Sequence, residues 1–302
     1  MIPVTTLHFH LRSAQPLDFG RNPGSSVRGA LYEALRSMYD TGLHVRDHLA
    51  DERNPVSWLL SLEDAATSGG KDAPRPIAIR PLQNGFGLSF YGRALDYIPL
   101  VLSAVDGMSQ VGVGPKRTRF EIDRVDAIDP LTTQATTILN EAGEQVAPLP
   151  QPPTEAAYRR FAAMLDPTRL EVTFLTPTRI VDRGSLCHTP TFRPWFQRLL
   201  ERTRLISELY MPEPIWVPFR DLLTCAKDVA IVQDDTTWVE AWSGSRRQNA
   251  YQPTSGFTGR VAYQSIHTEL LPWVLLGQAL QVGKHTIKGG GWYTVRYQWQ
   301  TI

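Results

Sequence analysis

Two separate segments of the chain share one pattern, and this internal repeat constrains the fold more than any other feature. Residues 95–125 and residues 269–299 each read as an apolar helix, a glycine-rich loop and an alternating final strand. Self-similarity of this kind indicates that one supersecondary unit occurs twice. Helical stretches also separate the other apparent strands, which favours two βαββαβ modules over one doubly wound sheet. We therefore expect an α+β protein with two tandem βαββαβ modules.

A proline-rich connection at residues 143–153 marks the expected domain boundary. Its sequence, GEQVAPLPQPP, interrupts both helical and strand patterns. The chain has 302 residues, 42% of them hydrophobic, which is enough to fill two mid-sized cores. We expect an N-terminal domain at residues 1–150 and a C-terminal domain at residues 151–302.

Local patterns predict individual elements. Residues 4–11 alternate like a strand, and a helix with Ser25 or Ser26 as its N-cap follows. The apolar residues of this helix recur at helical spacing from Val27 to Met38, which predicts a stripe that faces the core. Further helices are expected at residues 94–108, 155–165 and 191–209.

Charge is unevenly distributed along the chain, although the net charge of +1 is low for a nucleic-acid-binding protein. Residues 1–150 contain 14 Lys and Arg against 17 Asp and Glu, whereas residues 151–302 contain 17 against 13. Arg outnumbers Lys 26 to 5, and a guanidinium group can hold a phosphate with two hydrogen bonds or stack on a base. An anion-binding surface is therefore expected in the second half.

The sequence carries no signal for a membrane or secreted protein. No apolar run approaches the roughly 18 to 20 residues of a membrane span, and the N-terminus alternates like a strand instead of showing a signal-peptide core. Cys187 and Cys225 are the only cysteines, too few for a disulfide framework or a cysteine-based zinc site. We expect a cytoplasmic protein.

The strongest local signal for binding is the segment VGKHTIKGGGWYTV at residues 282–295. Glycine lets backbone amides approach a phosphate, and the lysines and the histidine add charge and hydrogen-bond donors. A plain helix-to-strand turn is the competing interpretation, while the nucleotide-binding patterns GxxxxGK[ST] and GxGxxG are absent. The expected binding residues here are Gly283, Lys284, His285, Lys288, Gly289, Gly290 and Gly291.

A second basic segment covers residues 242–264, where Arg246, Arg247 and Arg260 alternate with aromatic residues. This combination suits RNA, because Arg pairs with phosphates while rings stack on unpaired bases. The alternative is an ordinary hairpin whose aromatic residues belong to the core.

His44 and His48 would share one face of a helix, and three interpretations stay open for them. They are solvated surface residues, a metal pair, or acid–base catalysts. The metal pair lacks a third ligand at recognisable spacing. As a catalyst, a histidine can take the proton of a ribose 2′-hydroxyl or protonate a departing 5′-oxygen. Tyr32 could orient or donate a proton, and Arg28, Arg36 or Arg53 could stabilise the charged phosphorus centre.

The remaining histidines carry weaker signals. His8 and His10 share one face of the first strand, because strand side chains alternate, and they have a structural role or line an RNA cleft. Cys187 beside His188 forms no dyad pattern, since adjacent residues of an extended chain point in opposite directions.

Several of these segments resemble the Cas6 family of RAMP-type CRISPR proteins, and the resemblance covers most of the chain. GSSVRGALYEAL at residues 24–35 resembles the family's first helix, and VTFLTPTRI at residues 172–180 resembles the strand that opens the second domain. SGSRRQ and GFTGRV resemble the Arg loop and the hairpin after it. The segment 282–295 resembles the signature glycine-rich loop, with His285 added and Trp292 where many relatives carry Arg.

The resemblance implies tandem ferredoxin-like, RRM-like domains and recognition of a CRISPR repeat hairpin. It implies cleavage of precursor CRISPR RNA without a metal or other cofactor, leaving a 5′-hydroxyl and a 2′,3′-cyclic phosphate. The catalytic histidine of the family corresponds to His48, with His44 nearly as good, and its tyrosine to Tyr32. The arginines, lysines and glycines named above become contacts to RNA.

Two further implications concern partners and alternatives. The protein is expected to stay on its product hairpin in an effector complex with other Cas proteins. A non-catalytic subunit that binds CRISPR RNA is the alternative, and a metal-dependent hydrolase using His44 and His48 is a third possibility.

Overall fold

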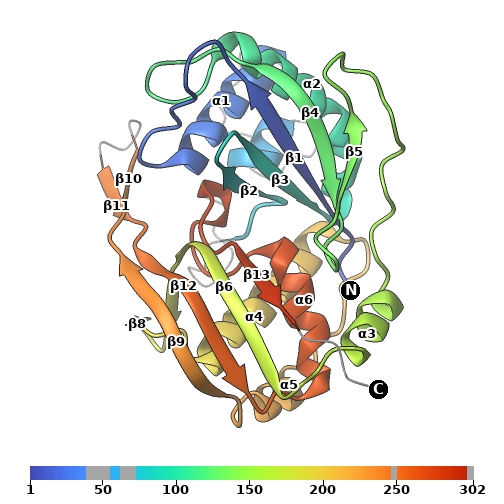
Figure 1. Ribbon diagram of the computed structural model, residues 1–302, viewed down its shortest axis with the longest axis vertical. Coiled ribbons are helices and arrows are strands. Elements are labelled where there is room, and N and C mark those ends of the chain that lie inside the picture. Colours follow the sequence, from blue (N-terminus) through green and yellow to red (C-terminus); the bar gives the residue numbers. More distant parts are fainter. Residues whose placement is uncertain (39–54, 62–72, 246–249, 298–302) are drawn as a thin grey trace.

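The computed structural model contains two antiparallel sheets, one from each half of the chain (Figure 1). It describes residues 1–38, 55–61, 73–245 and 250–297. The first sheet uses strands between residues 4 and 139, and the second uses strands between residues 169 and 296. The connection at residues 143–153 lies between them and forms no helix or strand apart from an isolated bridge of Gln145 to Leu139.

The first sheet has five strands in the order β2-β3-β1-β4-β5. Helix α1 follows the first strand and helix α2 follows the third, so the chain order is βαββαβ with one added strand. The elements are β1 Val4–Arg12, α1 Pro23–Met38, a π-helix Ser57–Ser61, β2 Ile77–Leu82, β3 Gly85–Tyr91, a 3-10 helix Gly92–Tyr97, α2 Ile98–Val111, β4 Glu121–Ile128 and β5 Ala135–Leu139.

The second sheet has four strands in the order β13-β6-β12-β9. Its central elements repeat the βαββαβ order, and two short hairpins, β7–β8 and β10–β11, are inserted between them. The elements are α3 Glu155–Ala163, β6 Arg169–Thr178, β7 Ile180–Asp182, β8 Ser185–Cys187, α4 Phe192–Tyr210, α5 Phe219–Cys225, β9 Ala230–Val239, β10 Trp242–Ser245, β11 Ala250–Pro253, β12 Gly256–Gln264, a 3-10 helix Thr268–Leu270, α6 Leu271–Leu280, a 3-10 helix Thr286–Lys288 and β13 Tyr293–Arg296.

Both sheets have the same topology. In each, the first and third strands of the module are central, and the fourth and second flank them. This is the ferredoxin-like arrangement, so the expected fold class is confirmed. The repeated unit inferred from sequence corresponds to α2 with β4 and to α6 with β13. Strand β5, which extends the first sheet beyond β4, was not expected.

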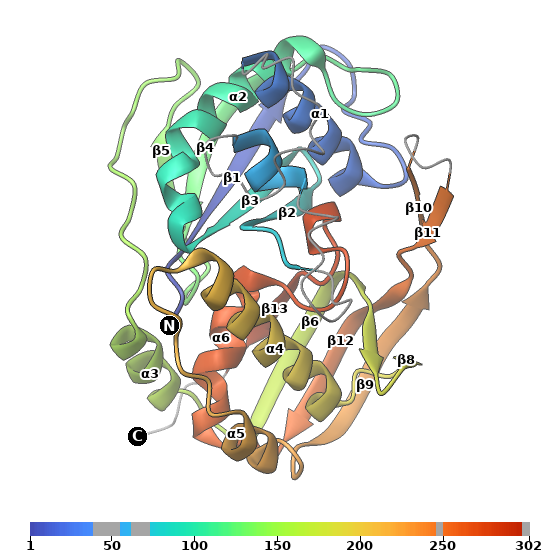
Figure 2. The same cartoon turned by 180° about the vertical axis from the view of Figure 1, so that it is seen from behind.

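The main helices of both modules lie on one side of the molecule. Figure 1 shows α1, α2, α4 and α6 behind the sheets, and Figure 2 shows them in front. Strand β1 explains the layering, because Leu7, Phe9 and Leu11 are buried in the core while His8 and His10 occupy the opposite face. His8 and His10 therefore lie on the face of the first sheet that has no helix drawn over it in Figure 1.

The start and end of helix α1 differ from the expectation. The helix begins at Pro23, where the missing N–H costs no hydrogen bond, so neither Ser25 nor Ser26 is its N-cap. The Ser26 hydroxyl instead donates to the Phe19 carbonyl at 2.7 Å. At the other end Met38 is 47% exposed, so the apolar stripe ends at Leu35.

The two modules meet through buried hydrogen bonds. Arg80 on β2 donates to the Gln278 carbonyl of α6 at 2.6 Å, and the Tyr91 hydroxyl donates to the Ala279 carbonyl at 3.2 Å. Gln281, just after α6, donates to the Ile79 carbonyl at 3.2 Å. Each bond joins the first sheet to the last helix, so the junction has a defined geometry. Among the described residues, no helix is long and apolar enough to cross a membrane.

Candidate functional site

The histidines expected to catalyse, His44 and His48, lie outside the described residues, as does Arg53. Tyr32 is described and packs half-buried against the core on α1. Because i, i+4 positions share a helix face, it lies between Arg28 and Arg36.

The two arginines on this face of α1 differ in environment. The Arg28 guanidinium donates to the carbonyl of Leu60, within the π-helix, at 2.7 Å. Arg36 is exposed in the last turn of α1. Arg28 therefore has a structural partner, whereas Arg36 presents its charge to solvent at the end where the chain enters residues 39–54.

The N-terminus of α1 packs directly on the glycine-rich loop. A Cβ atom at Gly24 would overlap the carbonyl group of Lys288, so this close approach requires glycine. A Cβ atom at Gly289 would lie 2.8 Å from the ring of Pro81 on β2. The loop is thus held between α1 and β2 of the first module while belonging to the second.

Three cations surround His285 in this loop. Burial first, and then the charges of Lys288, Arg179 and Lys284, lower the pKa of His285 to about 4, against a backbone hydrogen bond to Pro253 that raises it. The side chain is therefore neutral at pH 7. The charged groups that shift its pKa are all cationic, which makes this corner a local positive patch. We call Arg179, Lys284, His285 and Lys288 the cationic corner.

The backbone amides of this loop are largely engaged within the protein. The amides of Gly289, Gly290 and Gly291 donate to the carbonyls of Thr286, His285 and Pro177 at 3.0, 3.0 and 3.1 Å. The expectation that amides of this loop approach a phosphate stays a prediction, and these three amides already have partners within the protein. Side chains, not these amides, supply the positive charge of the loop, and the glycines allow its tight path.

Two other glycine-loop positions show the same structural requirement. Gly283 has φ 81° and Gly291 has φ 73°, both left-handed. A Cβ atom at Gly283 would lie 2.5 Å from the Arg179 carbonyl oxygen. Close packing and positive φ together explain why glycine occurs here, independently of any ligand.

The hairpin of β10 and β11 lies in the same region of the molecule as the glycine-rich loop. Figure 1 shows β10 and β11 rising beside the first module. The Asn22 amide donates to the Trp242 carbonyl at 2.8 Å, and the hydroxyls of Ser25 and Ser243 lie 3.2 Å apart. Arg246 and Arg247 lie outside the described residues, between these two strands.

Arg260 and Trp242 are the described members of the basic and aromatic segment that face solvent. Arg260, on β12, is 51% exposed and lies 3.8 Å from Asp235, which partly compensates its charge. Trp242 on β10 is 56% exposed. Phe257 and Tyr263, by contrast, are fully buried, so part of the aromatic pattern belongs to the core as the alternative interpretation held.

Acid should destabilise the protein through His285. Its folded pKa of about 4 lies below the usual 6.5, so the unfolded state binds more protons between these values. Stability therefore falls as the pH is lowered through this window, by about 1.4 kcal/mol for each unit of pKa shift. When the pH is lowered from 7.5 to 4.5, the free energy of unfolding measured in urea should decrease less for His285→Asn than for wild type. Asn tolerates the left-handed φ of 66°. Parallel pH profiles would contradict this role of His285.

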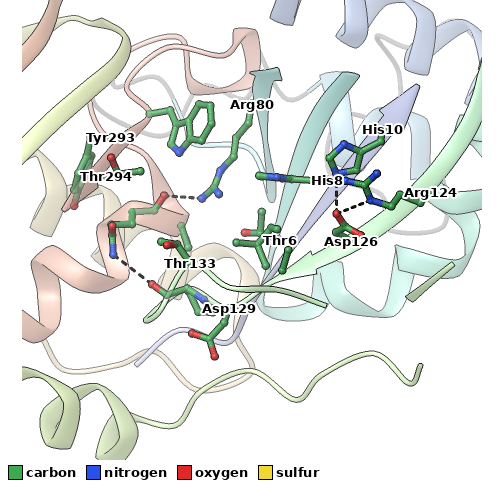
Figure 3. A pocket seen from close by; sticks show the side chains of 16 residues that line it. Thr6, His8, His10, Arg80, Arg124, Asp126, Asp129, Thr133, Tyr293 and Thr294 are labelled. Atoms are coloured by element: carbon green, nitrogen blue, oxygen red, sulfur yellow. Dashed lines mark hydrogen bonds and ion pairs between the residues drawn. The ribbon is translucent and has the colours of Figure 1, made fainter. Parts of the chain in front are cut away.

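A row of polar side chains crosses the open face of the first sheet, and sequence analysis found only part of it. In the register, His8 faces Gly87 of β3 on one side and Asp126 of β4 on the other, and Gly87 faces Arg80 of β2. Figure 3 shows His8, His10, Arg80, Arg124 and Asp126 converging on one pocket.

This pocket lies at the junction of the modules and has a volume of ≈ 310 Å³. The second module contributes Gln278, Trp292 and Thr294 to its wall. Only the two histidines could be placed here from sequence, through the alternation of β1. The other groups depend on strand pairing and on contact between modules, which no local pattern encodes.

Among the described residues, no group of three or more His, Cys, Asp and Glu side chains is arranged to hold a metal ion. The two cysteines are free and half-buried.

Comparisons with known proteins identify related families. A family model described as CRISPR-associated endoribonuclease Cas6 matches residues 172–293, and a model described as an N-terminal domain matches residues 2–151. A comparison with the sequences of curated proteins finds no match.

Solved structures share the fold over almost the whole chain. A Cas6 product complex superposes with a TM-score of 0.59 at 14% identity, covering 97% of this chain and 99% of that one. Thermus thermophilus Cas6 gives 0.56 at 15% identity, covering 98% and 99%. A partial Cas6-RT-Cas1–Cas2 complex gives 0.60 at 12% identity, covering 100% of this chain and 47% of that one.

The Cas6 model begins within β6 and ends at the first residue of β13, so it includes the cationic corner, and the Cas6 structures share the fold over both ferredoxin-like modules. Residues 172–293 of this chain therefore match the Cas6 family of CRISPR-associated endoribonucleases, and the chain as a whole has the fold of solved Cas6 structures.

Proposed function

We propose that the protein is a metal-independent endoribonuclease that binds a CRISPR repeat hairpin and cleaves precursor CRISPR RNA. The observation that carries this proposal is the cationic corner, which lies where the glycine-rich loop meets the N-terminus of α1. The match of residues 172–293 to the Cas6 family model supports the reaction class.

RNA binding is assigned to the groups around this corner. Lys284, Lys288 and Arg179 would pair with backbone phosphates, which dominate the affinity of nucleic-acid complexes. His285, neutral at pH 7, would exchange hydrogen bonds with RNA instead of adding charge. Arg246 and Arg247 follow β10 in the sequence, and the exposed Trp242 of β10 offers a ring for an unpaired base.

Catalysis is assigned to His48, with His44 as the second histidine and Tyr32 as an orienting group. One histidine takes the proton of the ribose 2′-hydroxyl, and the 2′-oxygen attacks the adjacent phosphorus. The bond from phosphorus to the 5′-oxygen breaks, and the other histidine donates a proton to that oxygen. The products are a 2′,3′-cyclic phosphate and a 5′-hydroxyl. Arg36 and Arg53 would stabilise the negative charge that develops on phosphorus.

Partners follow from the same assignment. The protein would keep its product hairpin on the cationic corner and join other Cas proteins of an effector complex in the cytoplasm. A solved relative of this fold occurs in a Cas6-RT-Cas1–Cas2 complex, which supports assembly with Cas proteins.

The 2′-hydroxyl provides the sharpest test of the chemistry. A repeat RNA with one 2′-deoxynucleotide at the cut position should bind with unchanged affinity and remain uncut, because the attacking oxygen is missing. Placing the same deoxynucleotide one position away should leave cleavage intact, and mapping should show cyclic phosphate ends. Cleavage of the first RNA would exclude this mechanism, and binding without cleavage of any RNA would favour a non-catalytic subunit.

A further inference from the structure

The junction pocket contains the buried cation Arg80, which has no acidic partner in the described part of the chain. The side chain of Arg80 is 5% exposed, and among the described residues its Nε has no hydrogen-bond partner. Its Nη2 donates to the Gln278 carbonyl at 2.6 Å. Burial lowers its pKa to about 10, and Tyr91 is the single ionisable group that opposes this, so Arg80 stays charged at pH 7. An uncompensated buried guanidinium that lines a cavity favours an anion there.

A second unsatisfied group lies beside Arg80. In the described structure the Nε2 atom of His8 is buried without a hydrogen-bond partner. Burial, followed by the charges of Arg80 and His10, lowers the pKa of His8 to about 3, so its imidazole is neutral. The two side chains approach across Gly87, where a Cβ atom would lie 2.7 Å from the His8 ring. The fold therefore keeps this space open with a glycine.

Trp292 gives the pocket an aromatic wall. Its ring centroid lies 5.3 Å from the Arg80 guanidinium carbon and 6.3 Å from the His8 ring, with the two rings nearly perpendicular. Pro130 and Ala279 add apolar surface. Apolar walls with a few convergent polar groups are typical of small-molecule sites.

The other wall carries acceptors. The Asp126 carboxylate lies 2.8 Å from His10 Nε2 and 3.2 Å from Arg124 Nε, and Asp129 stands exposed at the rim. Such carboxylates accept hydrogen bonds from hydroxyl or amino groups, but they repel a second phosphate. At the cationic corner, in contrast, the charged groups that shift the pKa of His285 are all cationic, and the Glu240 carboxylate interacts only with Arg179 among them. A polyanionic strand is therefore favoured at the corner, and a compact ligand with one anionic end is favoured in the pocket.

We propose that the junction pocket is a binding site for a free mononucleotide. Its phosphate would lie against Arg80 Nε and His8 Nε2, its base among Trp292, Pro130 and Ala279, and its hydroxyl groups near Asp126. Recognition comes from the polar row across the first sheet and needs no glycine-rich phosphate loop. Because the lining residues come from both modules, the ligand bridges them and stabilises their junction.

The test uses adjacent positions of β5 as a matched pair. Ala135 lines the pocket, whereas Thr136, the next residue of the strand, does not, and both are exposed. We would titrate the full chain with AMP, GMP, CMP and UMP, with adenosine and with inorganic phosphate, and measure binding heat and melting temperature.

At least one mononucleotide should bind wild type and Thr136→Trp with equal affinity and raise the melting temperature of both. Its binding to Ala135→Trp should be at least about tenfold weaker, because the tryptophan ring fills the site. Arg80→Gln, checked for folding by its melting curve, should lose the preference for AMP over adenosine. No saturable binding to wild type, or equal binding to both Trp variants, would overturn the proposal. A third result would also overturn it: single-stranded RNA binds Ala135→Trp more weakly than wild type, while no mononucleotide binds. The pocket would then hold part of the RNA strand. None of these readouts depends on RNA cleavage.

Discussion

Replacing His48 with alanine is expected to stop cleavage of the repeat RNA while leaving its binding nearly unchanged. A positioned general acid or base contributes about 10²–10⁴-fold to the rate, and a single neutral histidine contributes little to the affinity for a polyanion. The measurement is a single-turnover cleavage rate beside a filter-binding titration. His285→Asn is the control, because His285 is assigned to binding, so the variant should retain the chemical step, and Asn tolerates the left-handed φ at this position.

The outcome for His44→Ala decides how the two histidines share the reaction. A comparable loss in both variants would indicate an acid and a base, and a loss in only one would assign the whole step to that residue. Wild-type cleavage rates in both single variants and in the double variant would show that neither histidine takes part in catalysis.

Removing the charges of Lys284 and Lys288 together is expected to weaken RNA binding strongly. Both lysines belong to the cationic corner, and each phosphate contact that is lost lowers the slope of log K against log[salt] by about 0.7–0.9. Lys284→Gln/Lys288→Gln should therefore lose affinity most at low salt and show a shallower salt dependence by about one to two units. Affinity is measured from 50 mM to 300 mM salt, about the range over which such contacts are screened.

Arg220→Gln/Lys227→Gln removes the same number of charges from another part of the second module. Arg220 lies on α5 and Lys227 follows it, and both are exposed. Figure 1 shows α5 at the end of the second module that is remote from the junction. This control should retain wild-type affinity and slope. Equal losses in the two double variants would mean that total charge, not the cationic corner, governs binding.

The fold could be predicted from sequence because its signals are local. The repeated helix, glycine-rich loop and strand correspond to α2 with β4 and α6 with β13, and the alternation of β1 places His8 and His10 on one face. The predicted start of α1 was wrong. Pro23 tolerates the first helical position, whereas the prediction took one of the two serines after it as the N-cap.

The candidate site could be predicted only in part, for a physical reason. Lys284, His285 and Lys288 stand together in sequence, but Arg179 joins them through a contact between β6 and the loop. Arg80 donates its hydrogen bond to Gln278 of the other module, and its place near His8 depends on the pairing of three strands through Gly87. Such long-range pairings leave no periodic trace. The division at residue 150 and the roles of His44 and His48 stay predictions.

The central claim is tested most directly by incubating the wild-type chain with labelled repeat RNA from its own genome in excess EDTA. The proposal predicts one cut below the hairpin, with a rate equal to that in Mg²⁺, because no step uses a metal. Cleavage that requires Mg²⁺ and disappears in EDTA would contradict the proposed mechanism, and tight binding without any cut would contradict the assignment as an active ribonuclease.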